Sequence, residues 1–91
     1  MRPVTVRIAC VQLRARPTAD AELAMHDVLA GIATSAGHDA KIAVLPECSY
    51  PGYVLLKRAF PGGAGGSQRA LATIAEAARR NSIDVCIGMA L

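Results

Sequence analysis

A glutamate follows the second apolar run of the sequence, in the stretch KIAVLPECSYPGY at residues 41–53. Pro46 lacks a backbone N–H and biases the preceding residue towards extended geometry, so the run Ile42 to Leu45 is expected to end as a strand. Functional groups in open α/β sheets gather beyond the carboxyl ends of strands. A half-buried carboxylate holds its proton more tightly and can act as a general base. Glu47 is therefore a candidate catalytic residue, and the alternative is a loop glutamate paired with an arginine.

Three cysteines offer thiols, and Cys48 lies directly beside this glutamate. Adjacent side chains of an extended segment point to opposite faces, so Glu47 and Cys48 are not expected to form a hydrogen-bonded pair. Neither histidine of the chain clearly supports Cys48 as a nucleophile, and we interpret it as a packing or bystander residue. Cys10 and Cys86 fall within apolar runs and are expected to be small core residues.

The glycine-rich stretch GGAGGS at residues 62–67 precedes an apolar periodic segment. Backbone N–H groups at the start of a helix can bind phosphate. However, no GK[ST] follows, and the stretch does not fit GxGxxG or follow a strand directly. We therefore interpret it as a flexible connector.

Apolar periodicity places these candidates on alternating strands and helices. Residues 4–13 predict a strand buried on both faces, residues 41–46 a second short strand, and residues 83–91 a third. A first helix is expected from about Asp20 to a stop at Gly37. Its apolar stripe consists of Met25, Val28, Leu29, Ile32 and Ala36.

A second helix is expected from an N-cap at Ser67 to Asn81, after a loop with a possible helical turn near residues 54–60. Arg79 and Arg80 suit the negative end of its dipole. Its predicted apolar stripe consists of Leu71, Ile74, Ala75 and Ala78.

The order β-α-β-α-β predicts an α/β fold with a parallel sheet and right-handed crossovers. A straight strand order would place both helices on one face and leave the other bare, whereas a reversed order would give each face one helix. In either arrangement two helices cover three strands poorly, and 53% of the residues are hydrophobic. We therefore expect these residues to be the opening portion of a larger α/β domain.

Composition narrows the possible partners of this 91-residue chain. A net charge of +3 without a basic stripe, together with three aromatic residues, argues against nucleic-acid binding. No run is long enough for a signal peptide core or a transmembrane helix, so we expect no membrane partner. The wide cysteine spacing matches no metal site and favours reduced thiols in a cytoplasmic protein. We expect no cofactor and no metal.

Three segments together resemble the nitrilase superfamily, the carbon–nitrogen hydrolases. VRIACVQL is similar to the first strand of that family, and KIAVLPECSYPGY is similar to its strand that ends in Pro-Glu, with Gly52 and Tyr53 following. SQRALATIAEAARRNSIDVCIGMA resembles the next helix and strand. The resemblance implies that residues 1–91 are a partial domain, truncated after the third strand, of a four-layer α-β-β-α sandwich.

The family uses a glutamate, a lysine and a cysteine to cleave amides, nitriles or carbamoyl compounds. By resemblance Glu47 is the general base, and Tyr53 lines the substrate pocket. Neither Lys41 nor Lys57 occupies the lysine motif, and none of the three cysteines occupies the nucleophile motif. The resemblance thus implies that the chain alone is inactive, and that the complete enzyme is a homo-oligomer acting on a small-molecule amide or nitrile.

A second reading assigns the chain to another class, a small non-catalytic α/β binding or interaction domain. It would use an exposed sheet face or the GGAGGS stretch. A soluble, cooperatively unfolding product with a measurable ligand would favour this reading.

Overall fold

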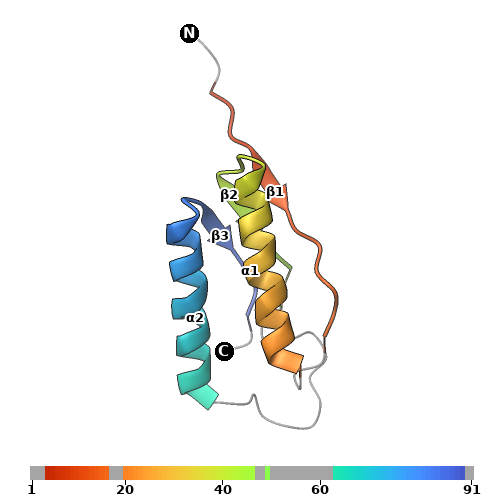
Figure 1. The fold of residues 1–91 in the computed structure, drawn as a ribbon, viewed down its shortest axis with the longest axis vertical. Helices are drawn as coiled ribbons and strands as arrows, with labels where there is room; N and C mark the ends of the chain where they lie inside the picture. Colours follow the sequence, from red (N-terminus) through yellow and green to blue (C-terminus); the bar gives the residue numbers. More distant parts are fainter. Residues whose placement is uncertain (1–3, 17–19, 47–48, 50–62, 90–91) are drawn as a thin grey trace.

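A computed structural model describes residues 4–16, 20–46, 49 and 63–89, and of residues 63–67 it describes the backbone alone. Strands and helices alternate in it, as the apolar periodicity predicts (Figure 1). The elements are β1 (Ile8–Cys10), α1 (Ala21–Gly37), β2 (Ile42–Val44), α2 (Gly63–Arg80) and β3 (Asp84–Cys86).

The three strands form one parallel sheet in the order β1-β2-β3, so β2 is central. Ala43 of β2 is paired with Ala9 on one side and with Val85 on the other. The strand order is thus straight, and it selects between the two arrangements that the sequence leaves open. With right-handed crossovers, both helices lie on one face, and Figure 1 shows α1 and α2 side by side in front of the strands.

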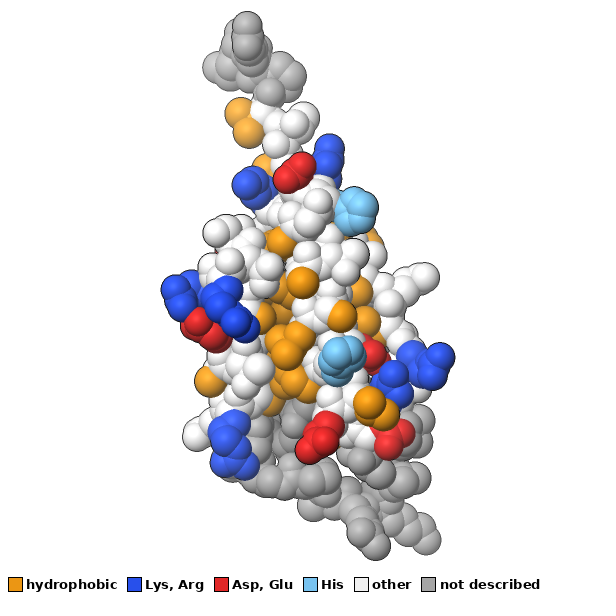
Figure 2. All heavy atoms as spheres, viewed as in Figure 1, with side chains coloured by type: hydrophobic (Ala, Val, Ile, Leu, Met, Phe, Trp, Pro, Cys, Tyr) orange, Lys and Arg blue, Asp and Glu red, His pale blue; other side chains and the backbone are white. Residues whose placement is uncertain are grey.

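The core lies between this face of the sheet and the two helices. Ala43 is fully buried beneath them, and Val28 and Ile32 of α1 are the largest fully buried side chains. Apolar side chains are visible between the helices, whereas charged side chains lie towards the periphery (Figure 2). The buried cluster consists of Val28, Ile32, Ala40, Ala43, Leu45, Ile74, Ala77 and Ile83.

The opposite face of the sheet has no covering layer among the described residues. Ile8 is 55% exposed and Val44 is 37% exposed. Cys10 and Cys86, which pair with Val44 from the two neighbouring strands, are also exposed. The predictions that residues 4–13 are buried on both faces and that these cysteines are core residues are therefore wrong. An apolar run indicates that a strand favours burial, but it does not say whether a covering layer is present.

Helix α1 confirms its predicted stripe. Val28 and Ile32 are buried, while the other three members are partly buried and pack against the core. Gly31 lies on the side of the helix nearest the continuation of β1. A Cβ atom at this position would lie 2.9 Å from Cγ1 of Val11, so the glycine permits a close approach of helix and strand segment.

Helix α2 differs from its prediction in the face that it buries. Ala70, Ile74 and Ala77 are buried, whereas Leu71 is 44% exposed and Ala75 is exposed. Alanines occur on several sides of this helix, so neighbouring faces have similar hydrophobicity. Contact with β3 and α1 therefore decides which face is buried, rather than the position of the largest side chain.

Helix α2 also begins earlier than predicted, at Gly63. Ser67 is therefore a helical residue and not the N-cap, and residues 63–66 belong to the helix rather than to a flexible connector. Glycine propensity alone disfavours a helix here, and a prediction based on it places the helix start too late. The helical turn predicted near residues 54–60 lies outside the described residues.

Both helices end in the same hydrogen-bonded motif. In α1, the Asp39 amide donates to Ala36 and the Ala40 amide to Ser35. In α2, Ser82 and Ile83 donate to Arg79 and Ala78 in the same way. These are the two bonds of the Schellman motif, with a buried apolar residue entering the next strand.

The left-handed residue of each motif is not glycine. Asp39 has φ 62° and Ser82 has φ 52°. The expected helix stop at Gly37 is therefore only partly correct, because Gly37 is the last helical residue and the chain reverses two residues later. An aspartate or serine can adopt this conformation, at a steric cost that glycine avoids.

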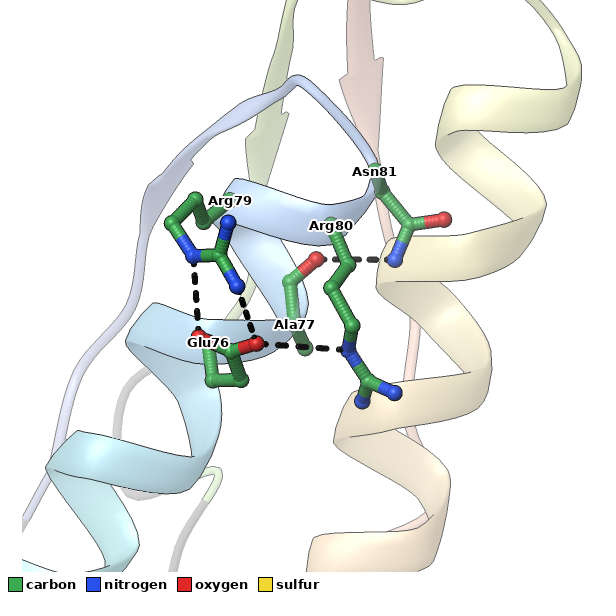
Figure 3. Close-up of polar contacts among 5 residues, drawn as sticks. All are labelled: Glu76, Ala77, Arg79, Arg80 and Asn81. Carbon is green, nitrogen blue, oxygen red and sulfur yellow. Dashed lines mark hydrogen bonds and ion pairs between the residues drawn. The ribbon is translucent and has the colours of Figure 1, made fainter.

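Polar contacts reinforce the end of α2 (Figure 3). The Asn81 side chain donates to the Ala77 carbonyl at 2.8 Å, which confirms that the helix ends there. Arg79 donates to the Glu76 carboxylate, and Arg80 lies 3.9 Å from it. The hydrogen bonds from Arg79, and then the charge of Arg80, lower the pKa of Glu76. Both arginines lie in the last turn, as predicted from the helix dipole.

We predict that Ser82→Gly stabilises the chain, because it removes the strain of a left-handed serine. The expected gain in free energy of unfolding is about 0.5–1 kcal/mol, since the glycine also gives the unfolded chain more freedom. Urea unfolding followed by circular dichroism measures it. Ser82→Ala is the matched control and is expected to unfold at a lower urea concentration than Ser82→Gly. The opposite order would contradict the strain argument.

Candidate functional site

The carboxyl end of β2 is held against β3 beyond the last paired residue of the sheet. The Leu45 amide donates to the Cys86 carbonyl at 2.8 Å, and the Leu45 side chain is buried. Pro46 follows and is exposed. Because the strands are parallel, their carboxyl ends meet at one edge, which is where open α/β sheets carry functional groups.

Ser49 fixes the chain on the far side of this exit. Its amide donates to the Gly88 carbonyl at 3.0 Å, and its hydroxyl donates to the Pro46 carbonyl. The residue is buried. Residues 46 and 49 are thus joined to each other, and Ser49 is also joined to the segment that continues β3.

Residues 47 and 48 fall between these anchored positions in the sequence. Glu47, Cys48 and Tyr53 lie outside the described residues, so their predicted roles stay predictions. The structure describes the frame around the Pro-Glu step: a strand exit paired at Leu45 and a return contact at Ser49.

Ser49 is the residue that our sequence reasoning missed. A serine three residues after a proline, within a turn-rich stretch, can bond its hydroxyl to a backbone carbonyl. The stretch Pro46 to Ser49 therefore allows the hydroxyl bond to be predicted from the sequence. The contact between Ser49 and Gly88 could not be predicted, because hydrogen bonding between two distant segments does not alter the apolar periodicity of either one.

A groove of about 580 Å³ lies elsewhere, between β1 with its continuation and one side of α1. None of its lining residues comes from the carboxyl end of β2 or from Ser49. Its polar residues include Arg7, Arg14 and His38. This groove and the residues Leu45 and Ser49 therefore lie in different parts of the described structure.

Among the described residues, no three histidine, cysteine or acidic side chains are grouped so that they could hold a metal ion. Neither of the two helices is long and apolar enough to cross a bilayer.

A parallel β-α-β-α-β unit, with backbone hydrogen bonds at Leu45 and Ser49 beyond its central strand, defines an α/β protein whose chemistry is expected at the carboxyl edge of the sheet. The sequence profile of the family "Carbon-nitrogen hydrolase" matches residues 7–91. The chain therefore belongs to the carbon–nitrogen hydrolase family, in agreement with the resemblance in its sequence. No curated protein and no solved structure gives a significant match.

We predict that Ser49→Ala destabilises the chain by about 1 kcal/mol, because the buried Ser49 residue loses its hydrogen bond to the Pro46 carbonyl. Thr73→Ala is the matched control: its hydroxyl also donates to a backbone carbonyl, that of Arg69, but on an exposed helix surface. That control should change the free energy of unfolding by less than about 0.5 kcal/mol. Equal effects of the two substitutions in urea unfolding would contradict an anchoring role for Ser49.

Proposed function

We propose that residues 1–91 form the N-terminal part of a hydrolase that cleaves an amide, nitrile or carbamoyl carbon–nitrogen bond, with Glu47 as its general base. The family match over residues 7–91 carries the proposal. The backbone hydrogen bonds of Leu45 and Ser49 support it, because these residues precede and follow the Pro-Glu step in the sequence. A fixed backbone would limit the positions open to a base between them.

In this mechanism Glu47 takes the proton of a cysteine thiol, and the thiolate attacks the substrate carbon to form a covalent intermediate. A lysine ammonium stabilises the negative charge on the substrate oxygen or nitrogen. With an amide substrate, Glu47 gives this proton to the leaving amine or ammonia and becomes a carboxylate again. It then takes a proton from the water that attacks the thioester, and passes that proton to the cysteine sulfur as the acid is released.

The lysine and the nucleophile would come from outside residues 1–91. Lys41 precedes β2, at the opposite end of the strand from the Pro-Glu step. Cys10 and Cys86 lie within strands, with exposed side chains on the bare face. Cys48 is adjacent to Glu47 and stays a bystander in this proposal, whereas Tyr53 is proposed to line the substrate pocket.

The bare sheet face supports the proposal that the complete domain is a sandwich. Residues 1–91 would contribute one sheet and one layer of helices. A second sheet would pack on Ile8, Val44 and the two strand cysteines. Removing such apolar side chains from water contributes roughly 25 cal/mol per Å². We further propose that the complete enzyme is a homo-oligomer, as its family resemblance implies.

The general-base role is tested in a protein that extends residues 1–91 through the reading frame downstream of Leu91. We expect Glu47→Gln to lower kcat by about 10²–10⁴-fold, because an amide cannot accept the thiol proton. The free energy of unfolding should change by less than about 0.5 kcal/mol. Release of amine or ammonia from a panel of amides and nitriles measures the rate.

Glu76→Gln is the matched control, since it makes the same chemical change on the exposed surface of α2. It should leave kcat unchanged, and residues 1–91 alone should show no turnover. Retained activity in Glu47→Gln would contradict the general-base role. A downstream frame without a lysine and a cysteine motif would contradict the proposed catalytic set.

The sandwich proposal makes a separate prediction about the two strand thiols. In a Cys48→Ala background, Cys10 and Cys86 of residues 1–91 should react rapidly with a maleimide, because both are exposed. In the extended protein their reaction should slow by about 100-fold or more, since they would react only after local opening. Mass spectrometry follows both sites. Equal rates in the two proteins would show that no second sheet covers this face.

A further inference from the structure

The bare sheet face carries an amide side chain at the carboxyl end of β1. Alternate residues of β1 and its continuation pack against the core: Ala9, Val11 and Leu13. The residues between them are exposed on the opposite face: Ile8, Cys10 and Gln12. Ile8 and Cys10 suit an apolar covering layer, whereas an amide is costly to bury without hydrogen-bond partners. Gln12 therefore marks the position where polar contacts replace the apolar ones of this face.

Gln12 lies beside Pro46 at the carboxyl edge of the sheet. The pairing of Cys10 with Val44 continues beyond the strands, because the Val11 amide donates to the Val44 carbonyl at 2.9 Å. Two residues further along each segment, the same register places Gln12 next to Pro46. Pro46 directly precedes the proposed general base in the sequence. Gln12 is thus the polar side chain of the β1 segment whose register brings it to the proposed chemistry.

The two sides of Pro46 differ in how the described chain occupies them. On the β3 side, the Ser49 amide donates to the Gly88 carbonyl. On the β1 side the ladder stops, because the next donor would be the amide of residue 46, and a proline has no N–H. The Val11 carbonyl points towards β2 with its own amide, and no described residue donates a backbone hydrogen bond to it. The β1 side therefore keeps an acceptor for another donor.

The groups on this side favour a ligand that donates hydrogen bonds. The Val11 carbonyl can only accept, and the Gln12 side-chain oxygen is a second acceptor. The nitrogen of a primary amide or carbamoyl group carries two N–H donors, one for each acceptor. A nitrile nitrogen has no N–H, so it would leave both acceptors without a partner. A buried acceptor without a donor is costly, and this cost discriminates between the two substrates.

We infer that Gln12 is a specificity-determining residue of the proposed hydrolase, whose side-chain oxygen and the Val11 carbonyl together bind the NH2 group of a primary amide or carbamoyl substrate. This role rests on the proposed function, and it narrows the substrate class by making nitriles the poorer substrates. Gln12 acts by binding alone, and the proton transfers remain with Glu47.

The test uses the protein that extends residues 1–91 through the downstream reading frame. A primary amide and a nitrile with the same carbon skeleton are compared by kcat/KM, or by inhibition constant where one of them is not turned over. Gln12→Leu should lower kcat/KM for the amide at least about fivefold, mainly through KM, because a hydrogen bond to the substrate nitrogen is lost. The value for the nitrile should change less than about twofold.

Gln68→Leu is the matched control, since it makes the same change on the exposed surface of α2. It should leave the values for both substrates unchanged. Pro46→Ala tests the second acceptor independently, because it supplies an N–H that would take up the Val11 carbonyl. Whatever its effect on the absolute rates, the preference for the amide over the nitrile should fall at least about threefold. This variant decides the result if Gln12→Leu fails to fold in urea unfolding experiments.

Equal losses on the amide and the nitrile in Gln12→Leu would overturn the inference, because they would show that Gln12 binds another part of the domain, such as a second sheet. Glu47→Gln separates this result from the proposed function. If Glu47→Gln abolishes turnover but Gln12→Leu and Pro46→Ala keep the wild-type preference, the specificity role alone is wrong. If the extended protein neither binds nor cleaves any amide, the proposed function and the role of Gln12 are both wrong.

Discussion

The straight order of three parallel strands determines most of what this molecule presents to its surroundings. Because β2 is hydrogen-bonded on both sides, its Ala43 lies at the centre of the sheet, beneath the helices. Right-handed crossovers then leave no choice about where the helices lie: both must pack on the same side. The bare face, the free edge of β1 and the shared carboxyl edge all follow from this single constraint.

Small residues allow that arrangement to pack closely. The row that faces the helices is Ala9, Ala43 and Val85, and α1 adds Gly31 against Val11. Short side chains let helix and sheet backbones approach, but each buries little apolar area. Much of the apolar content of the chain is therefore used in close contacts, while larger side chains such as Ile8 and Val44 stay on the uncovered face.

The sequence predicted the order of elements, the apolar stripe of α1 and the C-terminal ends of both helices to within two residues. These features follow from local periodicity and capping, which a single chain reveals. Prediction from the sequence was wrong where a neighbouring layer decides which side chains are buried. Cys10 and Cys86 have the composition of buried strand residues but meet no covering layer, and alanine-rich α2 turns a different face inward. The role of Ser49 was not predicted, because Ser49 and its partner Gly88 are 39 residues apart in the sequence.

The bare face and the free edge require different chemical partners. The bare face offers apolar side chains from Ile8, Cys10 and Val44, so an apolar layer is needed to cover it. The edge offers backbone donors and acceptors of β1 that have no partner strand among the described residues, so an extended chain is needed to pair with it. A second sheet packed on the face would leave the edge groove open, because the groove lies on the helix side of β1.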